Sequence, residues 1–492
     1  MAQGNNHLLL RRLHELIGST AGSCGELTVS GVQLDSRKVQ PGDLFLAVPG
    51  DAHDGRQFIE QAVAAGAAAV VAQAPVAGFV DDVPVPLLEH PELAPDVGSI
   101  AAAFYGRPTS AMNVVGCTGT NGKTTVSRLI AQLFRLLDQQ CGVVGTLGMS
   151  LADDIAEAIN TTPDAVSLQA QLARWHTQGV PHVAMEVSSH ALEQGRVNGT
   201  DFNVAVFTNL SHDHLDYHGT MAAYGQAKAR LFRWPGLETA IINVDDEFGA
   251  ALASTVSADC LRYSASNSHA DLYLKDIRYD DHGATARLFS PWGEGVVHSP
   301  LPGAFNLSNL LAAIAAVACR GVPLQSVIDA VPSLRGVPGR MQLIAAPDYA
   351  VVVDYAHTPD ALEQVLCALR PHVSNRLIVV FGCGGDRDPD KRPVMGRIAS
   401  QLADVVVITS DNPRSEEPQA ILEDIARGCE TPVTTQVDRG VAIDQAIDLA
   451  TQGDCVLIAG KGHEDYQIVG ADRLHFSDAE HAAQAIRRRA GA

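Results

Sequence analysis

The segment that decides the fold of this chain reads G-C-T-G-T-N-G-K-T-T, from Gly116 to Thr125. An apolar run that ends in Val114-Val115 predicts a strand before this segment. Apolar residues at helical spacing predict a helix after it, and they are Val126, Leu129, Ile130, Leu133, Leu136 and Leu137. A glycine-rich loop between a strand and a helix N-terminus is typical of a nucleoside triphosphate site in an α/β domain.

The phosphate loop, residues 116–125, offers the groups that such a ligand needs. Its backbone N–H groups and the dipole of the following helix attract an anion. We expect Lys123 to reach the β- and γ-phosphates and the hydroxyl of Thr124 or Thr125 to ligate Mg²⁺. The strict pattern G-x-x-x-x-G-K-[ST] has glycine where Cys117 stands, so an incidental glycine turn is the alternative.

Composition indicates a multidomain enzyme of the cytoplasm. The 492 residues exceed what one core accommodates, and 46% of them are hydrophobic. A formal charge of −21 disfavours general binding to nucleic acid, which depends on basic patches. Nine cysteines without a C-x-x-C pair favour reduced thiols, and no apolar segment reaches the roughly 20 residues that a membrane span needs. We expect a cytoplasmic monomer with no nucleic-acid or membrane partner.

Two changes of composition suggest domain boundaries. Four prolines crowd residues 84–95, and residues 335–340 read R-G-V-P-G-R. The predicted fold is α/β in three domains: a small N-terminal α/β domain, a central phosphate-loop domain with a parallel sheet, and a C-terminal Rossmann-like domain, at 1–92, 93–338 and 339–492. In the first domain the pattern predicts two strands and a helix between them, at 43–48, 67–71 and 57–65.

Two apolar segments of the middle domain each lead into polar side chains. Residues 182–185 precede Glu186, and residues 204–207 precede the loop that contains His214. Ligands collect beyond the carboxyl ends of parallel strands, so both side chains are expected near the phosphate loop as candidate metal ligands. Mg²⁺ prefers oxygen donors, which suits Glu186 better than His214. The alternatives are loop hydrogen bonding without a metal, and a zinc hydrolase that would use His212, Asp213, His214 and His218.

The third domain repeats the same pattern four times. Apolar strands are expected at 349–353, 377–381, 405–409 and 455–459, and each is followed by charged residues. Cationic and anionic groups together suit a zwitterionic ligand such as an amino acid. A dinucleotide site at 382–387 is a weaker alternative, because Arg387 stands where the third glycine of G-x-G-x-x-G belongs.

Longer motifs resemble those of the Mur ligases, ATP-dependent enzymes that build the peptide of the bacterial cell-wall precursor. The resemblance covers nearly the whole chain, with motifs at 118–125, 185–190, 208–216, 303–309 and 354–359. This family has the shorter loop form G-T-x-G-K-T, which begins at Gly119. This form does not require a glycine at the position of Cys117. The resemblance implies an ATP-binding ligase of peptidoglycan synthesis, and thus a role in cell wall biogenesis, cell shape, cell division and the cell cycle.

The segment Asp411-Asn412-Pro413-Arg414 resembles the signature of family members that add meso-diaminopimelate to UDP-N-acetylmuramoyl-L-alanyl-D-glutamate. Diaminopimelate carries a second carboxylate that lysine lacks, and a guanidinium binds a carboxylate through two hydrogen bonds. By resemblance, the carboxylates of this amino acid would contact Arg387 and Arg414. Its ammonium groups would contact Asp411 and Glu464, and Gly460 would provide a backbone contact.

The resemblance implies three further sets of residues. The UDP-linked substrate would contact Leu34, Ser36, Asp51, Ala52, His53, Asn160, Thr161, Thr162, Ser188, Gln194 and Arg196. ATP would contact Gly119, Thr120, Asn121, Gly122, Lys123, Thr124, Thr125, Asn306, Arg340 and Asp354. Two Mg²⁺ ions would be held by Thr124, Glu186, His214 and Lys228, the last as a carbamate (N6-carboxylysine).

The implied reaction begins with phosphoryl transfer from ATP to the side-chain carboxylate of the D-glutamyl residue, and Lys123, Glu186, His214 and Lys228 are its catalytic residues. The amine of diaminopimelate then attacks the acyl phosphate. A lysine-adding sister ligase or a folylpolyglutamate synthetase-like relative stays open, disfavoured by Arg414 and by the loop at 160–163. A GTPase-type switch is disfavoured because the chain has no N-K-x-D motif.

Overall fold

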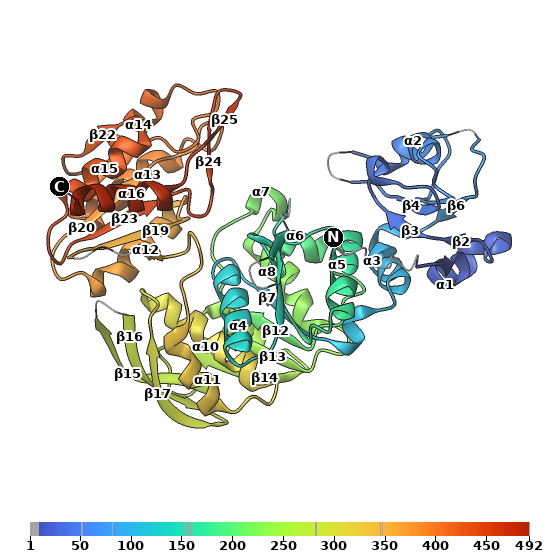
Figure 1. Ribbon diagram of the computed structural model, residues 1–492, viewed down its shortest axis with the longest axis horizontal. Helices are drawn as coiled ribbons and strands as arrows, with labels where there is room; N and C mark the ends of the chain where they lie inside the picture. Colours follow the sequence, from blue (N-terminus) through green and yellow to red (C-terminus); the bar gives the residue numbers. More distant parts are fainter. Residues whose placement is uncertain are drawn as a thin grey trace. The chain divides into compact units, whose positions relative to one another are not determined.

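The computed structural model describes residues 9–50, 53–80, 82–151, 154–156, 160–280, 283–344, 346 and 348–491 (Figure 1). The chain forms two compact units, Met1–Arg262 and Tyr263–Ala492. The three domains with boundaries near 92 and 338 stay a prediction.

The first unit begins with a small parallel sheet. Its four strands are, in spatial order, β3 (Gly31–Gln33), β4 (Asp43–Ala47), β5 (Ala69–Gln73) and β6 (Leu87–His90). Three helices pack on this sheet, namely α1 (Leu13–Ile17), α2 (Ile59–Ala64) and α3 (Leu93–Phe104). A short antiparallel pair precedes the sheet in the chain and consists of β1 (Arg11–Arg12) and β2 (Thr28–Val29). The two predicted strands appear as β4 and β5, and the predicted helix begins as a 3-10 turn before α2.

A second sheet of the first unit contains the phosphate loop. Five parallel strands lie in the order β8 (Cys141–Gly145), β11 (His182–Glu186), β7 (Asn113–Thr118), β12 (Val204–Phe207) and β13 (Thr239–Asn243). One edge continues into two antiparallel strands, β9 (Gly148–Leu151) and β10 (Asp154–Ala156). The helices of this region are α4 (Lys123–Leu136), α5 (Ala165–Thr177), α6 (Ser189–Glu193), α7 (Leu215–His218), α8 (Met221–Ala229) and α9 (Glu247–Ala253). Because β7 lies between β11 and β12, the loops that follow these three strands share one edge of the sheet.

The second unit begins with an antiparallel ribbon that the sequence analysis did not predict. It consists of β15 (Leu272–Asp280), β16 (Gly283–Ser290) and β17 (Gly293–Ser299). The end of β14 (Asp259–Ser264) pairs with β15 through Tyr263 and Ser264. Two helices follow, α10 (Ala304–Ala318) and α11 (Leu324–Ala330), and α10 is buried along most of its length.

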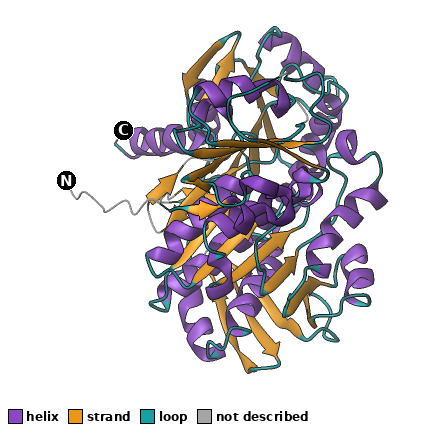
Figure 2. Ribbon diagram, turned by 90° about the vertical axis from the view of Figure 1, so that its right-hand side faces the viewer, coloured by secondary structure: helices purple, strands orange, loops and turns teal. Residues whose placement is uncertain are grey.

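The rest of the second unit is a doubly wound sheet. Its strands lie in the order β18 (Gln342–Ile344), β19 (Ala350–Asp354), β23 (Cys455–Ala459), β20 (Leu377–Phe381), β21 (Val405–Thr409) and β22 (Thr434–Gln436). All are parallel except β18. One face is covered by α12 (Pro359–Leu369), α13 (Lys391–Leu402) and α14 (Pro418–Ala426), and the other by α15 (Arg439–Leu449) and α16 (Asp478–Ala490) (Figures 1 and 2). A final hairpin pairs β24 (Tyr466–Val469) with β25 (Asp472–His475).

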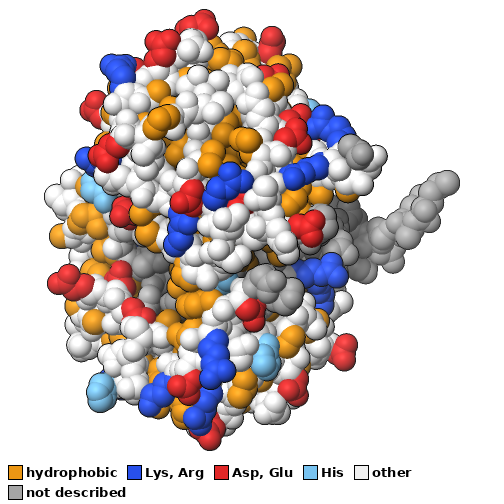
Figure 3. All heavy atoms as spheres, turned by 90° about the vertical axis from the view of Figure 1, so that its left-hand side faces the viewer, with side chains coloured by type: hydrophobic (Ala, Val, Ile, Leu, Met, Phe, Trp, Pro, Cys, Tyr) orange, Lys and Arg blue, Asp and Glu red, His pale blue; other side chains and the backbone are white. Residues whose placement is uncertain are grey.

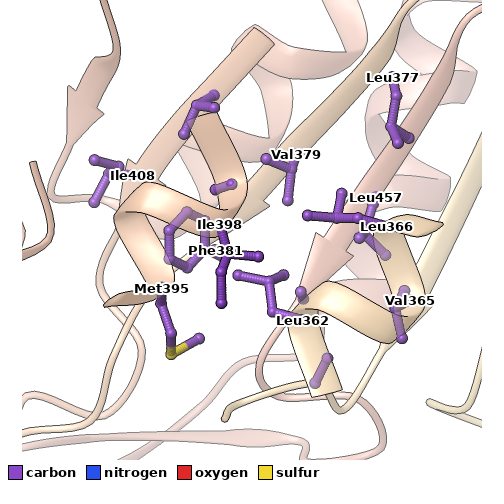
Figure 4. Packing of buried hydrophobic residues seen from close by; sticks show 14 of the residues in the cluster. Leu362, Val365, Leu366, Leu377, Val379, Phe381, Met395, Ile398, Ile408 and Leu457 are labelled. Atoms are coloured by element: carbon purple, nitrogen blue, oxygen red, sulfur yellow. The ribbon is translucent and has the colours of Figure 1, made fainter. Parts of the chain in front are cut away.

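Side-chain alternation along the strands assigns their residues to the two faces of this sheet. Val379 and Phe381 belong to the core beneath α12 and α13, where they meet Leu362 and Met395 (Figure 4). Ile378, the neighbour of Val379, lies in the opposite core with α15 and α16. Apolar side chains on both faces are the pattern expected of a buried parallel sheet, so the α/β fold class is confirmed.

The surface is charged and mixed. On the face drawn in Figure 3, acidic and basic side chains lie interspersed among patches of apolar ones. Within the residues that the structure describes, no helix is both long and apolar enough to span a bilayer.

Candidate active site

The phosphate loop adopts a conformation that depends on two glycines. Gly119 has φ 147° and Gly122 has φ 86°, values that side chains other than glycine rarely adopt. A Cβ atom at Gly119 would lie 1.9 Å from Oγ1 of Thr208. Lys123 is the first residue of α4, and its Nζ donates to the carbonyl oxygens of Gly119 (3.0 Å) and Thr120 (2.8 Å). The lysine therefore lies at the loop, beside the N-terminus of the helix.

Glu186 is held at this loop from the end of β11. Its Oε2 accepts a hydrogen bond of 2.9 Å from the hydroxyl of Thr124. This hydroxyl is one of the two that the sequence pattern predicts as a Mg²⁺ ligand. Thr146 donates to the same carboxylate through its backbone N–H (2.8 Å) and its hydroxyl (3.1 Å). Glu186 is only 1% exposed. Thr146 was missed by the sequence analysis, although it follows β8 in the same strand-then-polar pattern.

Lys228 lies against the other side of the loop. Its buried Nζ donates a hydrogen bond of 2.7 Å to the Gly119 carbonyl and lies 4.3 Å from the centre of the Tyr224 ring. Burial, with the charge of Lys123 nearby, lowers the pKa of the Lys228 amine well below its ordinary value. Within the described ranges no carboxylate forms an ion pair with it. The lowered pKa makes a larger fraction of this amine neutral than in an exposed lysine.

His214 is linked to the loop through Tyr224. The two rings are 6.1 Å apart, and the Tyr224 hydroxyl lies 3.3 Å from Oγ1 of Thr120. His214 has φ 53° and is half exposed, and its Nε2 lies 3.4 Å from Oδ2 of Asp213. Burial raises the pKa of Tyr224 to about 12, so this hydroxyl stays protonated.

Oxygen donors dominate the place where a cation would bind. Thr124 and Glu186 supply a hydroxyl and a carboxylate, which fit Mg²⁺. The zinc interpretation is not supported: among the residues that the structure describes, no three His, Cys, Asp or Glu side chains are placed to hold a metal. The four residues named for it, His212, Asp213, His214 and His218, thus form no such cluster in the structure.

Residues expected to hold the UDP-linked substrate near Glu186 form a connected group. Oγ1 of Thr161 lies 3.1 Å from Oγ1 of Thr146, and the Thr162 hydroxyl donates to the Glu186 carbonyl (2.8 Å). Ser188 donates its N–H to Thr162 (3.2 Å), and Arg196 donates to the Thr162 carbonyl (3.2 Å).

The other residues expected for this substrate are less connected. Gln194 donates to the Tyr217 hydroxyl (3.3 Å), and Asn160 is exposed. Beside the small sheet, the Ser36 hydroxyl donates to Gln61 (3.0 Å), Leu34 packs against the apolar core, and the His53 ring lies 6.4 Å from that of Phe58. Asp51 and Ala52 lie outside the described residues.

In the second unit, acidic and basic groups meet at the carboxyl ends of β21 and β23. The buried Nζ of Lys461 lies 3.3 Å from Asp411 Oδ1, 3.1 Å from Asn412 Oδ1 and 3.6 Å from Glu464 Oε2. Asn412 also donates to Glu464 (3.2 Å). Two carboxylates thus share one lysine, so these three groups together keep one negative charge that a ligand ammonium group would complement. Lys461 was missed, because a lysine between glycines is typical of an exposed loop.

Arg387 and Arg414 extend from adjacent loops. Nη1 of Arg414 donates to the Gly385 carbonyl (2.9 Å), and Nη1 of Arg387 donates to the Asp386 carbonyl (2.9 Å). Neither guanidinium forms an ion pair with any described carboxylate. Both cations are therefore available to the carboxylates of a ligand.

A buried ion pair supports the same strand ends from behind. Arg439 and Asp478 are both fully buried, with Nε to Oδ1 at 2.7 Å. Arg439 also donates to the carbonyls of Ser410 (3.2 Å) and Ala459 (3.0 Å), the residues directly before Asp411 and Gly460. Gly460 has φ 122°, and a Cβ atom there would lie 3.3 Å from Asp411 Oδ2.

Of the residues expected at ATP in this unit, Arg340 and Asp354 lie close enough that the charge of Arg340 acts on the Asp354 carboxyl. Arg340 stacks on the Tyr355 ring at 4.4 Å. Asp354 accepts backbone hydrogen bonds from Met341 (2.7 Å) and Ala356 (2.8 Å), and burial raises its pKa. Asn306 lies on α10, where it donates to Pro302 (2.7 Å) and accepts from Asn309 (3.2 Å).

Comparisons with known proteins identify the family of this chain. Three family models match the chain: "Mur ligase family, catalytic domain" at 28–105, "Mur ligase middle domain" at 117–317 and "Mur ligase, glutamate ligase domain" at 339–462. The UDP-N-acetylmuramoyl-L-alanyl-D-glutamate--2,6-diaminopimelate ligase of Pseudomonas aeruginosa is 51% identical over 465 residues, which cover 94% of this chain and 96% of the relative. The chain belongs to the Mur ligase family.

Other members of the Mur ligase family match over nearly their full length. The enzyme of the same name from Synechococcus elongatus is 49% identical over 479 residues, 95% of this chain and 96% of the relative. A solved structure of a UDP-N-acetylmuramoyl-L-alanyl-D-glutamate--2,6-diaminopimelate ligase has a TM-score of 0.76 at 40% identity, covering 98% of this chain and 99% of that one. A folylpolyglutamate synthase of Mycobacterium tuberculosis, at 21% identity and TM-score 0.62 over 81% of this chain and 96% of that one, shares the fold.

For this Mur ligase, the structure brings many of the predicted side chains together within each unit. Lys123, Thr124, Glu186 and Lys228 converge on the phosphate loop, and Asp411, Asn412, Glu464 and the two arginines surround the ends of β20, β21 and β23. His214 is linked to the loop through Tyr224. The roles assigned to these residues remain predictions.

Proposed function

We propose that this Mur ligase adds meso-2,6-diaminopimelate to UDP-N-acetylmuramoyl-L-alanyl-D-glutamate, cleaving ATP to ADP and phosphate. The observation that carries the amino-acid assignment is the charge arrangement around the ends of β20, β21 and β23. Arg387 and Arg414 form no ion pair with described carboxylates, while Asp411 and Glu464 share a single lysine. A ligand with two carboxylates and two ammonium groups complements these charges. The names of the relatives that match over most of the chain support the same assignment.

The reaction proceeds through an acyl phosphate. A carboxylate resists attack by an amine until its oxygen becomes part of a leaving group, so the D-glutamyl side chain first accepts the γ-phosphoryl of ATP. The amine then attacks the carbonyl carbon, an amide bond forms, and phosphate departs. Lys123 and the backbone N–H groups of residues 119–124 would balance the charge on the transferring phosphoryl.

The cation site is built from oxygen donors. Thr124 and Glu186 would hold one Mg²⁺, and His214 with Lys228 would hold a second. When bound, Mg²⁺ supplies charge neutralisation to the phosphate oxygens. The chain itself fixes the Glu186 carboxylate through the two hydrogen bonds from Thr146.

Lys228 would contribute to the second cation site only after modification. Its lowered pKa increases the fraction of neutral amine, which is the form that reacts with CO₂. The amine nitrogen bonds to the carbon of CO₂ and releases one proton, which leaves a carbamate with two oxygen donors. The modification therefore turns a buried amine into an anionic oxygen ligand.

Arg414 would give the preference for diaminopimelate over lysine. With lysine bound, one guanidinium in the site would lack the carboxylate that pairs with it. Leaving a partly desolvated charge unpaired costs on the order of 2–5 kcal/mol, or roughly a 30-fold to several-thousandfold preference.

The remaining assignments follow the family. The UDP-linked substrate would be held by residues near the small sheet and near Glu186, which are Leu34, Ser36, Asp51, Ala52, His53, Asn160, Thr161, Thr162, Ser188, Gln194 and Arg196. ATP would contact the phosphate loop, Asn306, Arg340 and Asp354. All nine cysteines are free thiols, which supports the cytoplasm as the compartment. We place the enzyme in peptidoglycan synthesis, hence in cell shape and division, as a monomer.

The test is phosphate release from ATP by purified protein with UDP-N-acetylmuramoyl-L-alanyl-D-glutamate. Three reactions are compared, with meso-diaminopimelate, with L-lysine and with no amino acid. Release that depends on diaminopimelate is expected. Release with lysine alone would keep the ligase chemistry and remove the role of Arg414, whereas release independent of both amino acids would overturn the function.

A further inference from the structure

The loops that carry Arg387 and Arg414 are joined by hydrogen bonds between the residues next to these two arginines. Asp386 precedes Arg387, and Ser415 follows Arg414. The Ser415 hydroxyl donates a hydrogen bond of 2.6 Å to Asp386 Oδ1, and its backbone N–H donates one of 3.2 Å to Oδ2. The backbone N–H of Asp386 donates in turn to Oε1 of Glu416 (2.6 Å). We call Asp386, Ser415 and Glu416 the clasp.

The clasp is anchored to a helix on its outer side. Both carboxylate oxygens of Glu416 accept hydrogen bonds of 2.8 Å from Nη2 of Arg392, on α13. Nη1 of the same arginine lies 3.0 Å from Asp424, on α14. The Glu416 end of the clasp is therefore fixed to the two helices that cover this face of the sheet.

The backbone at both arginine loops is also constrained. Asp386 has φ 54° and Arg414 has φ 53°, left-handed conformations that need support from their surroundings. Arg414 receives that support from the last hairpin, because its N–H donates to Ile468 (3.1 Å) and its carbonyl accepts from Gly470 (2.8 Å). Asp386 receives its support from the other two clasp residues, Ser415 and Glu416.

We propose that the clasp sets the spacing of Arg387 and Arg414, and that it thereby determines how strongly the site prefers an amino acid with two carboxylates. The inference rests on the proposed function. None of the three clasp residues is assigned a contact with substrate, so they act as positioning residues. The binding of an amino acid with two carboxylates depends on the distance between the two arginines, whereas the binding of an amino acid with one carboxylate does not.

Charge favours a persistent clasp at neutral pH. The hydrogen bond from the Ser415 hydroxyl contributes most to holding the pKa of Asp386 below its usual range, and the bond from the Ser415 N–H contributes next. The charges of Arg414 and Arg387 lower this pKa further. Asp386 is exposed, so its replacement leaves the core of the unit intact.

The experiment measures steady-state kinetics of Ser415→Ala and Asp386→Ala, with Ser415→Thr as the conservative variant. Each alanine variant is expected to raise KM for meso-diaminopimelate about five- to twentyfold, while kcat and KM for ATP stay within about twofold. The relative rate with L-lysine rises. Ser415→Thr keeps the hydroxyl and restores wild-type KM. Because the two residues act on each other, the double alanine variant is expected to be no worse than the poorer single variant.

Controls separate the clasp from general damage and from the proposed function. Ser254→Ala removes an exposed hydroxyl in the first unit and is expected to change nothing. Unchanged KM for diaminopimelate in both alanine variants would overturn the clasp, and so would an equal rise in KM for every substrate together with a lower melting temperature. Wild-type protein that releases no phosphate with diaminopimelate would overturn the proposed function instead, before any variant is compared.

Discussion

The Thr124 hydroxyl donates a hydrogen bond of 2.9 Å to the Glu186 carboxylate and so joins the first turn of α4 to the end of β11. The other carboxylate oxygen, Oε1, accepts the Thr146 N–H at 2.8 Å. A Cβ atom at Gly145 would lie 2.1 Å from that same oxygen. The end of β8 therefore fits around Glu186 with no space for a further methyl group.

This fit makes Gly145→Ala a test of the position of Glu186. Gly145 does not have a positive φ, so the clash with Glu186 is the main obstacle to the methyl group. A displacement of about 1 Å in a catalytic group costs on the order of 100-fold in turnover, which is the expected loss. Gly336→Ala is the matched control, since its nearest neighbour would lie 3.7 Å away. Full turnover of Gly145→Ala would mean that the carboxylate need not stay where the structure places it.

Lys123→Ala should abolish turnover and largely spare the fold. The side chain contacts the carbonyls of its own loop, so its removal takes a cation from the triphosphate without opening the core. Loss of one such group lowers kcat by about 100- to 1,000-fold or more. Phosphate release and thermal unfolding would be measured together, with the exposed Lys275→Ala as control. Turnover at the wild-type rate would remove the nucleotide assignment.

Arg414→Ala should weaken diaminopimelate use much more than ATP use. The guanidinium is expected to pair with a ligand carboxylate, and loss of such a pair costs about 2–5 kcal/mol, which raises KM by roughly 30- to 5,000-fold. KM for each substrate would be measured separately. Arg397→Ala, an exposed arginine on α13, is the control. An equal rise for both substrates would contradict a role in selectivity.

The sequence predicted those parts of the fold whose signals are local. The strands β20, β21 and β23 coincide with the expected ranges, because short apolar runs buried on both faces stand out from charged loops. The ribbon β15 to β17 was missed, because its strands mix exposed and buried positions without a strict alternation. The pair of Arg439 and Asp478 was also missed. Its members are 39 residues apart, and nothing near either one marks it as buried.

Lys228 should make activity depend on dissolved CO₂. Wild-type protein freed of CO₂ is expected to lose most of its turnover and to regain it when bicarbonate is added. Its buried amine has a lowered pKa, so more of it is neutral and reactive at neutral pH than an ordinary lysine. Labelled ¹³CO₂ should give a carbamate signal in the NMR spectrum of the wild type that Lys228→Ala lacks. Equal activity with and without CO₂, and no labelled signal, would refute the modification.

Asp454 should make the second unit sensitive to acid. Burial alone would raise the pKa of this carboxyl, but hydrogen bonds from Arg376 (2.7 Å) and from the Thr451 N–H (2.7 Å) outweigh burial and lower the pKa from 3.8 to about 2. The unfolded chain therefore binds more protons between these two values. The stability that Asp454 provides is complete above 3.8 and is lost as the pH falls toward 2.

Asp454→Asn tests this expectation. It should lower the free energy of unfolding by about 1.5–3 kcal/mol near pH 7, because it removes the charged acceptor of Arg376. The difference from wild type should shrink in acid, where the wild-type carboxyl becomes protonated and loses the same advantage. Urea unfolding followed by circular dichroism at about pH 7 and about pH 2.5 measures both values. Asp360→Asn, whose carboxylate accepts hydrogen bonds from Gln364, is the surface control and should stay within about 0.5 kcal/mol of wild type at either pH. A difference for Asp454→Asn that is the same at both pH values would show that its charge contributes nothing to the fold.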